Sequence, residues 1–208
     1  MTHQDKVKLV RDNIVSGAVV YKELVGKYYL YVFENGFLEM YFGTDNYMHL
    51  TGVGSRVNSK QFYELAKEHK LQEKQIFFSS RFPLRTAIQK TTCLFDLPNF
   101  VKEGYFIIQD LITDTAKYPY AITNIDQSIL MGLKMEDGMD DIYIPKSFRV
   151  NGKIFEKAEK DKIFEINYIL SKTDKERKYN TILYKDNTKL EELDKIILDK
   201  IDLSILKE

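Results

Sequence analysis

The stretch NYMHLTGVGS, residues 46–55, contains one of the three histidines of the chain, followed by a threonine and two glycines. Imidazole is the side chain whose unperturbed pKa allows it to exchange protons near neutral pH, so His49 is the best single candidate for acid–base chemistry. Thr51 lies two residues further on and carries a hydroxyl that can bind a substrate or orient the ring. The pattern therefore predicts a general acid or base with a hydroxyl beside it.

The same residues also fit a purely structural interpretation. Thr44, Asp45 and Asn46 are good N-cap residues, and Gly52 is typical of a left-handed C-cap, so a short helical turn is expected over residues 46–50. A histidine in the last turn of a helix is favoured by the helix dipole. Residue chemistry alone therefore leaves His49 open between a catalytic and a capping role.

RNA cleavage without a metal needs a base for the 2′-hydroxyl, an acid for the leaving oxygen, and donors for the phosphate. Possible donors are the arginines and serines of SSRFPLR (residues 79–85), the lysine of SILMGLKM and the lysine and serine of YIPKSF. Each of these residues can equally be solvated, and Ser147 can simply cap a turn. The candidate catalytic residues are His49, Thr51, Ser147 and Lys134, and the candidate substrate-binding residues are Arg81, Lys146 and Tyr47.

Several kinds of site have no matching pattern in the chain. There is no phosphate loop, no dinucleotide fingerprint and no HExxH motif. The stretch MEDGMDD, residues 135–141, lacks the ligand spacing of an EF-hand and is typical of a surface turn. Cys93 is the single cysteine, which excludes an internal disulfide and a multi-cysteine zinc site. We therefore predict no metal and no cofactor.

The composition indicates a globular protein of 208 residues, with 44% hydrophobic and 30% charged residues. The net charge is zero, from 31 basic and 31 acidic residues, which argues against non-specific binding to duplex nucleic acid but allows a local basic groove or a protein partner. The 14 tyrosines and 13 phenylalanines fit half-buried strands, or alternatively a stacking surface. The single cysteine, the lack of a signal-type start and the lack of a long apolar run predict a cytoplasmic protein without membrane contact.

Hydrophobic periodicity in the first half predicts helices and one hairpin. Asn-Gly between two aromatic-rich runs is a strong hairpin signal. Pro83 is expected near a helix start, and Pro98 is expected to stop the helical segment. The expected elements are a helix over 5–24, strands over 27–34 and 37–42, a helix over 59–70 and a helical segment over 73–98.

The second half returns to the strand period after residue 104. Strands are expected over 104–113, 118–124, 127–135, 162–172 and 179–186, with a short strand before Pro145. Residues 156–162 are expected to form a solvated loop or turn, and residues 188–206 an amphipathic helix. The predicted fold is α+β, with an N-terminal helix and β-hairpin, central helices, an antiparallel β-sheet and a C-terminal helix. We expect one domain over 1–208, made of a helical and hairpin half (1–100), a strand-rich half (101–187) and the C-terminal helix (188–208).

The aromatic hairpin KYYLYVFENGFLEMYF, followed by NYMHLTGV, a QFYELA helix and a downstream YIPKSF, resembles a phage-associated nuclease family. This family is the fourth phage-associated group of the barnase, EndoU, colicin and RelE-like superfamily. Its Phe/Tyr-x-His-Leu-Thr-Gly signature corresponds to residues 47–52, and its Tyr-x-Pro-x-Ser/Thr-Phe element to residues 143–148. The resemblance covers roughly residues 10–185.

The resemblance implies helices packed on an antiparallel sheet and a metal-independent ribonuclease encoded on phages and mobile elements. It carries over His49, Thr51 and Ser147 as candidate functional residues. Two main hypotheses follow: an endoribonuclease that binds RNA in the host cytoplasm, or a non-enzymatic phage protein that binds a host protein as a counter-defence or inhibitor module. A small-molecule binder is a third possibility, for which the chain has no motif. If His49 is catalytic, we expect it within about 10 Å of Ser147 or a lysine across an open groove.

Overall fold

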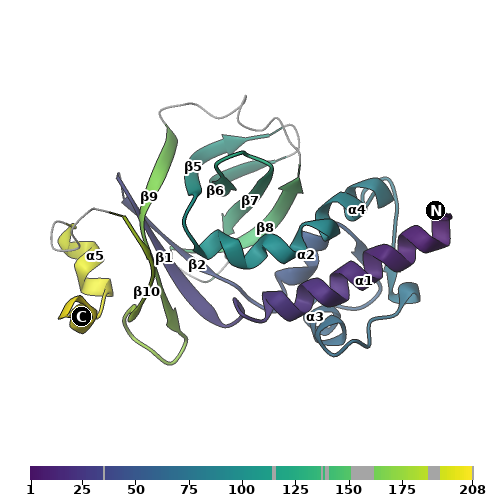
Figure 1. The fold of residues 1–208 in the computed structure, drawn as a ribbon, viewed down its shortest axis with the longest axis horizontal. Coiled ribbons are helices and arrows are strands. Elements are labelled where there is room, and N and C mark those ends of the chain that lie inside the picture. Colours follow the sequence, from purple (N-terminus) through teal and green to yellow (C-terminus); the bar gives the residue numbers. More distant parts are fainter. Residues whose placement is uncertain are drawn as a thin grey trace.

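Helices α1 to α4 occupy one end of the molecule, a set of strands lies in the middle, and α5 lies at the other end (Figure 1). The computed structural model describes residues 1–34, 36–113, 116–136, 138, 141–150, 162–186 and 193–207. The helices are α1 (His3–Tyr21), α2 (Tyr47–Thr51), α3 (Ser59–Lys67), α4 (Leu84–Thr92) and α5 (Lys195–Lys200), with 3-10 segments η1 (Glu73–Gln75), η2 (Leu94–Val101) and η6 (Leu203–Lys207). The strands are β1 (Lys27–Phe33), β2 (Gly36–Tyr41), β3 (Gly54–Ser55), β4 (Ile76–Phe77), β5 (Tyr105–Ile112), β6 (Lys117–Asn124), β7 (Ile129–Met135), β8 (Ile142–Val150), β9 (Ile163–Thr173) and β10 (Thr181–Lys185).

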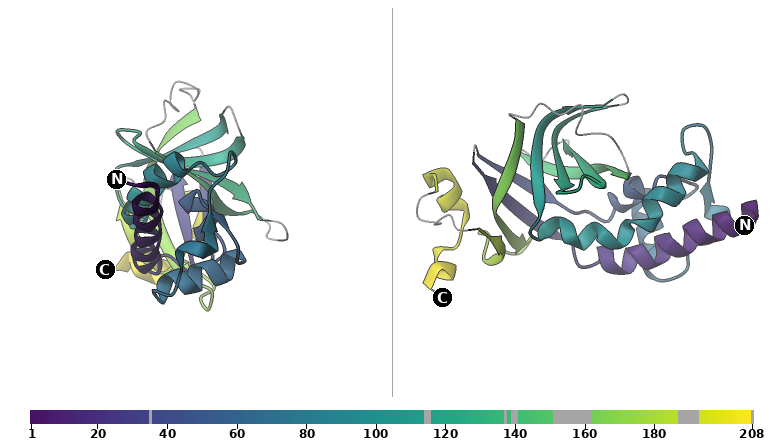
Figure 2. Two further views of the ribbon diagram at one scale, coloured as in Figure 1. Left: turned by 90° about the vertical axis from the view of Figure 1, so that its right-hand side faces the viewer. Right: turned by 45° about the horizontal axis from the view of Figure 1, so that its top comes forward.

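Seven strands close into a barrel in the order β1-β2-β8-β7-β6-β5-β9, because β9 pairs back onto β1. The strand β10 adds to β9 outside this ring, and β3 and β4 form a separate small pair. Closure leaves the barrel strands without free edges, which removes the hydrogen-bonding groups on which strands of other chains could pair. The curved strands enclose the barrel interior in both further views (Figure 2).

The α+β class is confirmed, but the predicted antiparallel sheet is only partly right. The sheet closes on itself, and β2 runs parallel to β8 with Glu39 opposite Ile142 and Met40 opposite Tyr143. The helices and the strands β5–β7 separate these two strands along the chain, so no tight turn forces them to be antiparallel. The long strand β9 completes the ring because one of its edges pairs with β1 and the other pairs first with β5 and then with β10.

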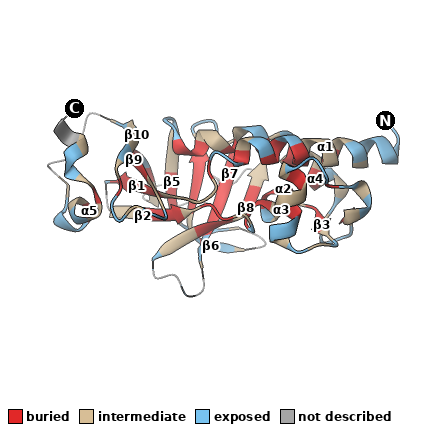
Figure 3. Ribbon diagram, turned by 90° about the horizontal axis from the view of Figure 1, so that it is seen from below, coloured by how far each residue is buried: buried red, intermediate tan, exposed pale blue. Residues whose placement is uncertain are grey.

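One hydrophobic core runs from the barrel interior into the helical end. Phe148 and Ile169 from the barrel and Ile14 and Leu50 from the helices belong to the same buried cluster. Buried residues follow the inner sides of the strands and the facing sides of α1, α2 and α4 (Figure 3). The helices therefore pack against the barrel as part of its core, and this contact fixes their position relative to β8.

Most expected elements occur at the expected places. The helix α1 and the β1–β2 hairpin agree with the sequence pattern, and α2 ends at Gly52, whose φ of 76° is left-handed. Pro98 does not stop a helix but lies inside η2, where the short 3-10 segment loses a single bond to the missing N–H. Pro145 lies inside β8 rather than after it, next to a register shift in the β7–β8 pairing that accommodates the missing donor.

The C-terminal part is less helical than expected. The helix α5 spans only Lys195–Lys200 and is followed by η6. Residues 188–192 of the expected helix, and most of the expected loop over 156–162, lie outside the described residues. The short strands β3 and β4 were not expected, since two residues each are too few to show a period.

A buried carboxylate joins α5 to the barrel. Glu39 of β2 is only 6% exposed, and it accepts hydrogen bonds from the Tyr179 hydroxyl at 2.8 Å and from Lys200 Nζ at 2.6 Å. Around it, Leu30, Leu170 and apolar residues of α5 form a second buried cluster on the outside of the barrel. Burial and the nearby Glu39 charge raise the pKa of Tyr179 well above its usual value. The ammonium of Lys200 is therefore the compensating charge for a carboxylate withdrawn from water.

Replacement of Glu39 and Lys200, singly and together by Gln, should show strong coupling in the free energy of unfolding. Either single change leaves a buried group without its charged partner, so we expect a coupling of about 1–3 kcal/mol in urea unfolding. The matched control is the exposed pair Glu68 and Lys70, 2.8 Å apart, for which the same cycle should show no measurable coupling. Equal coupling energies in the two cycles would contradict the role of Lys200 as the countercharge of the buried Glu39 carboxylate.

Candidate active site

The short helix α2 is held by buried tyrosines of the helical end. The Tyr47 hydroxyl donates to the Ile14 carbonyl of α1 at 2.6 Å, and the Tyr21 hydroxyl donates to the Gly43 carbonyl at 3.0 Å. The rings of Tyr21, Tyr47 and Tyr63 lie against one another at centroid distances of 4.9–5.7 Å. These contacts hold α2 against α1 and α3. The helix also packs against β8.

Two residues of the predicted site, Tyr47 and Thr51, are among the buried residues that hold α2 in place. Tyr47 and Thr51 are fully buried, and the Thr51 hydroxyl donates to the Met48 carbonyl at 2.8 Å. Neither side chain reaches the surface, so the geometry gives them a role in packing α2. We assign no substrate contact to either of them.

His49 lies in the last turn of α2 and is exposed at the surface. Desolvation by the surrounding protein lowers its pKa, the Lys146 ammonium lowers it further, and Asp45 and Glu136 act in the opposite direction. The imidazole is therefore neutral over a wider pH range than a free histidine.

The charges that act on His49 come from β8, from the residue after β7 and from the turn before α2. Lys146 is on β8, against which α2 packs, and its Nζ lies 3.2 Å from Glu136 Oε2. Ser147 is half-buried, directly follows Lys146 and pairs with Gly132 across the β7–β8 ladder. The Lys146 ammonium therefore acts electrostatically on His49, whereas the expected open groove between them stays a prediction.

The contacts described for Lys134 and Arg81 are with aromatic rings. Both are exposed; Lys134 Nζ lies 5.9 Å from the centre of the Tyr118 ring, and the Arg81 guanidinium lies 5.5 Å from the Phe82 ring. Arg81 precedes α4 in a loop, and none of the contacts described for it reaches His49. The structure thus brings together His49 and Lys146 with Ser147 next to Lys146 in the chain, whereas it gives Arg81 no link to them.

Two cations near this site were not singled out from the sequence. Arg149 of β8 donates from Nη2 to Thr113 Oγ1 at 3.0 Å, and its guanidinium lies 5.8 Å from the Tyr118 ring centre. Lys90 of α4 has a pKa lowered to about 8 by burial and by the Arg149 charge. The available signal was that Lys90 follows the buried Ala87 by three positions, which puts a lysine beside the apolar side of an amphipathic helix.

Gly52 explains how Lys90 reaches the end of α2. A Cβ at residue 52 would lie 2.8 Å from Lys90 Cδ, so the aliphatic stem of Lys90 crosses the space that a side chain would occupy. Gly52 also has a left-handed backbone conformation that L side chains rarely adopt. The glycine of the signature is therefore required twice, once to end α2 and once to admit Lys90.

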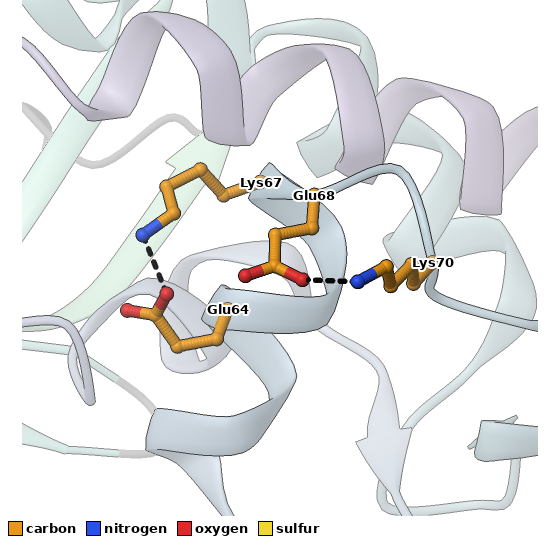
Figure 4. Close-up of polar contacts among 4 residues, drawn as sticks. All are labelled: Glu64, Lys67, Glu68 and Lys70. Atoms are coloured by element: carbon orange, nitrogen blue, oxygen red, sulfur yellow. Dashed lines mark hydrogen bonds and ion pairs between the residues drawn. The ribbon is translucent and has the colours of Figure 1, made fainter.

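A separate surface depression of about 450 Å³ lies beside the end of α3, lined by Arg11, His69, Lys70, Leu71, Gln72 and Glu73. It contains none of the predicted site residues. Its Lys70 is paired with Glu68, and a second pair joins Lys67 to Glu64 at 2.5 Å on the same helix (Figure 4). Both of these ion pairs lie within the protein and join neighbouring residues of the chain.

The fold is a closed seven-strand barrel with a helical end, and His49 lies at the surface of that end on α2, next to β8. The chain belongs to the family described as phage-Barnase-EndoU-ColicinE5/D-RelE like nuclease4, whose model matches residues 13–188. No match was found among curated proteins or among solved structures. Among the described residues, no helix is long and apolar enough to cross a membrane.

Replacement of Lys146 by Ala should raise the pKa of His49. The Lys146 charge disfavours the imidazolium, so its removal moves the pKa back toward the usual value of about 6.5. The measurement is an NMR titration of the His49 ring protons in wild type and in the variant under the same conditions. A His49 titration curve that stays in place would show that Lys146 does not act on the ring.

Replacement of Lys90 by Met should change how stability depends on pH. Since the pKa is about 8 in the folded chain and 10.5 in its reference state, the unfolded chain binds more protons between these values, and wild-type stability rises with pH across that window. The variant should lose this rise and be at least as stable as wild type at pH 7. Urea unfolding at pH 7 and pH 10 measures both, and a rise of equal size in the variant would contradict the lowered pKa.

Proposed function

We propose that this protein is a metal-independent endoribonuclease of phage or mobile-element origin that acts on RNA in the host cytoplasm, with His49 as its general base. The observation that carries the proposal is the lowered pKa of His49, which lies at the surface near Lys146 of β8. Membership of a nuclease family supports the same reaction class. Attack on a phosphodiester develops negative charge that nearby cations stabilise, and Lys146 is the cation that acts on His49.

The base has to remove the proton of the ribose 2′-hydroxyl while that oxygen attacks the adjacent phosphorus. A histidine accepts this proton only when neutral, and the lowered pKa of His49 provides the neutral form at pH 7. The product of the first step is a 2′,3′-cyclic phosphate, and the requirement for a 2′-hydroxyl restricts the substrate to RNA. This reaction needs no redox group and no activated water.

In this mechanism, Lys146 and Ser147 bind the phosphate next to the base. The Lys146 ammonium has a partial partner in Glu136, and a phosphate oxygen would compete with that carboxylate for it. Ser147 follows in the same strand and supplies a hydroxyl donor. Both belong to the second signature element, which gives that element a chemical role beside the His-Leu-Thr-Gly stretch.

Replacement of His49 by Gln should reduce cleavage of RNA by about 10²–10⁴-fold, which is the usual contribution of an acid–base side chain. Because the folded pKa of His49 is lowered, the acid limb of wild-type kcat/KM should lie below about pH 6.5. The assay is cleavage of a labelled oligoribonucleotide in the presence of EDTA, followed by detection of the cyclic phosphate.

The matched control is His69→Gln, which changes a histidine in the depression near α3 and should leave the rate unchanged. Equal rates for wild type and the His49 variant would remove the base role. Cleavage that disappears in EDTA would contradict the metal-independent mechanism.

A second candidate function is binding of a host protein as a counter-defence or inhibitor module. It is favoured by Ile112 and Met135, which are 54% and 48% exposed and lie at the same end of the barrel because β5 and β7 both pair antiparallel with β6. Host lysate passed over wild-type protein and over an Ile112→Asp, Met135→Asp variant tests this function. A partner retained in stoichiometric amount by wild type alone would support it, and retention of none would count against it.

A further inference from the structure

Two long stretches of the chain contain no aspartate and no glutamate. They are residues 46–63 and 74–95, the longest of this kind in a sequence with 31 acidic and 31 basic residues. The first contains α2 and β3, and the second contains β4 and α4. The two stretches meet because β3 pairs antiparallel with β4, with Gly54 opposite Phe77. The fold therefore joins two segments whose charged side chains are all basic, in a chain that has no net charge.

The pair β3–β4 has one side toward the core and one side away from it. Ile76 is part of the buried core cluster, and successive residues of a strand face opposite sides, so Phe77 faces away from the core. The Phe77 ring lies against Gly54, where a Cβ would be 2.5 Å from two ring carbons. The next residue pair is Arg56 and Gln75, since the Arg56 N–H donates to the Gln75 carbonyl at 2.9 Å. Gly54 is thus the residue that lets an aromatic ring lie on this outer side.

The loop after β4 adds a second ring and a second cation. The backbones of Ser79 and Phe82 exchange two hydrogen bonds of 3.1 Å, which close the turn. This turn places the Phe82 ring edge-to-face with Phe77 at a centroid distance of 5.8 Å, and the Arg81 guanidinium lies 5.5 Å from the Phe82 ring. Both arginines are exposed, and both rings are half-buried. We call Arg56, Phe77, Arg81 and Phe82 the β3–β4 surface.

The two arginines of the β3–β4 surface have no ion pair within the described residues, whereas Lys67 and Lys70 nearby are each paired with a glutamate. Exposed cations without an internal partner can bind phosphates, and partly exposed rings can stack on bases. Stacking on a side chain requires bases that are not already stacked in a duplex. The chemistry of this surface therefore fits a single-stranded nucleic acid.

The β3–β4 surface lies close to the proposed base. Gly54, on which the Phe77 ring lies, is five residues after His49, so their Cα atoms are at most about 18 Å apart. The helix α4 begins two residues after Phe82 and packs against α2. The strand β3 lies at the helical end of the molecule with α2 and α4 (Figure 3). A short single strand on this surface can therefore extend to His49.

We propose that the β3–β4 surface binds single-stranded RNA and holds it beside His49. The two arginines contact phosphates, and the two phenylalanine rings stack on bases. This deepens the proposed ribonuclease and rests on it for the choice of RNA as the ligand. It also gives the second glycine of the stretch NYMHLTGVGS a role, because Gly54 makes the position of the Phe77 ring possible.

The test is fluorescence anisotropy with a labelled, unstructured 2′-O-methyl oligoribonucleotide, whose blocked 2′-oxygen cannot attack, so that binding is measured without cleavage. The double variant Arg56→Ala, Arg81→Ala should raise Kd by about tenfold or more. The slope of log Kd against log salt concentration should fall by about 0.7 for each lost phosphate contact, or about 1.4 in total. Phe82→Leu should raise Kd by about fivefold or more and leave this slope unchanged, because it removes a stacking ring and no charge.

The matched control is Lys22→Ala, Lys117→Ala, which removes two exposed cations outside this surface and gives the same net charge. This control should bind the probe with wild-type affinity. The variant Arg56→Lys, Arg81→Lys keeps both charges and should recover most of the binding that the alanine variant loses. Melting curves of all variants show whether a loss of binding reflects a loss of folding.

The outcomes separate the inference from the proposed function. Wild type that cleaves RNA while the folded arginine and Phe82 variants bind the probe normally would overturn the surface and leave the ribonuclease standing. Wild type that binds the probe through these residues but cleaves no RNA would remove the ribonuclease and support the surface. Equal affinity for a duplex of the same sequence would overturn the single-strand assignment. A host protein retained by wild type and lost in the arginine-to-alanine variant, without binding of the probe, would make this a protein interface and also overturn the inference.

Discussion

The hydrogen bond from the Tyr47 hydroxyl to the Ile14 carbonyl is the contact on which the candidate site depends. The helix α2 has five residues, far fewer than the roughly 12–15 that an isolated helix needs to be even marginally stable in water. Its position is therefore set by what it buries, and the tyrosine fixes both its distance from α1 and its rotation. The exposed His49, two residues after Tyr47, points where it does because Tyr47 and Leu50 point inward.

The residues of the signature differ in burial: some pack α2 against the rest of the protein, and His49 is exposed. Tyr47, Leu50 and Thr51 are buried, so they set the geometry of the turn. His49 is the exposed residue of the signature, and the charges of neighbouring side chains act on it. Gly52 has no side chain, which leaves space for Lys90 of α4. A short motif of this kind reports a local structure first, and its chemistry depends on the residues that the rest of the fold brings to it.

The sequence predicted local structure well because periodicity and caps are local properties. The hairpin around Asn-Gly, the end of α2 at Gly52 and the α+β class could all be read from neighbouring residues. The closure of the barrel could not, because the pairings of β1 with β9 and of β2 with β8 join segments more than a hundred residues apart. Pro145 was misleading for the same reason, since its place in β8 depends on a register shift relative to β7.

The same contrast between local and long-range features holds for the candidate site. His49 and the second signature were visible in the sequence, and the structure adds an electrostatic link between His49 and Lys146. The burial of Tyr47 and Thr51 could not be read from their types, since tyrosine is intermediate between core and surface and threonine is mostly exposed. Lys90 and Arg149 were missed because a lysine on a helix and an arginine on a strand are ordinary until the fold brings the Arg149 charge close enough to lower the pKa of Lys90.

The hydrogen bonds of Glu39 determine where the chain can be truncated without loss of a buried contact. The family match ends at residue 188, yet the ammonium that compensates Glu39 comes from Lys200, and Ile197 and Ile201 cover the outer face of β1 and β9. A shortened chain that stops at the family boundary would keep every strand but expose apolar barrel surface and a carboxylate that lacks its countercharge. The boundary of sequence similarity and the boundary of the folding unit are therefore different in this protein.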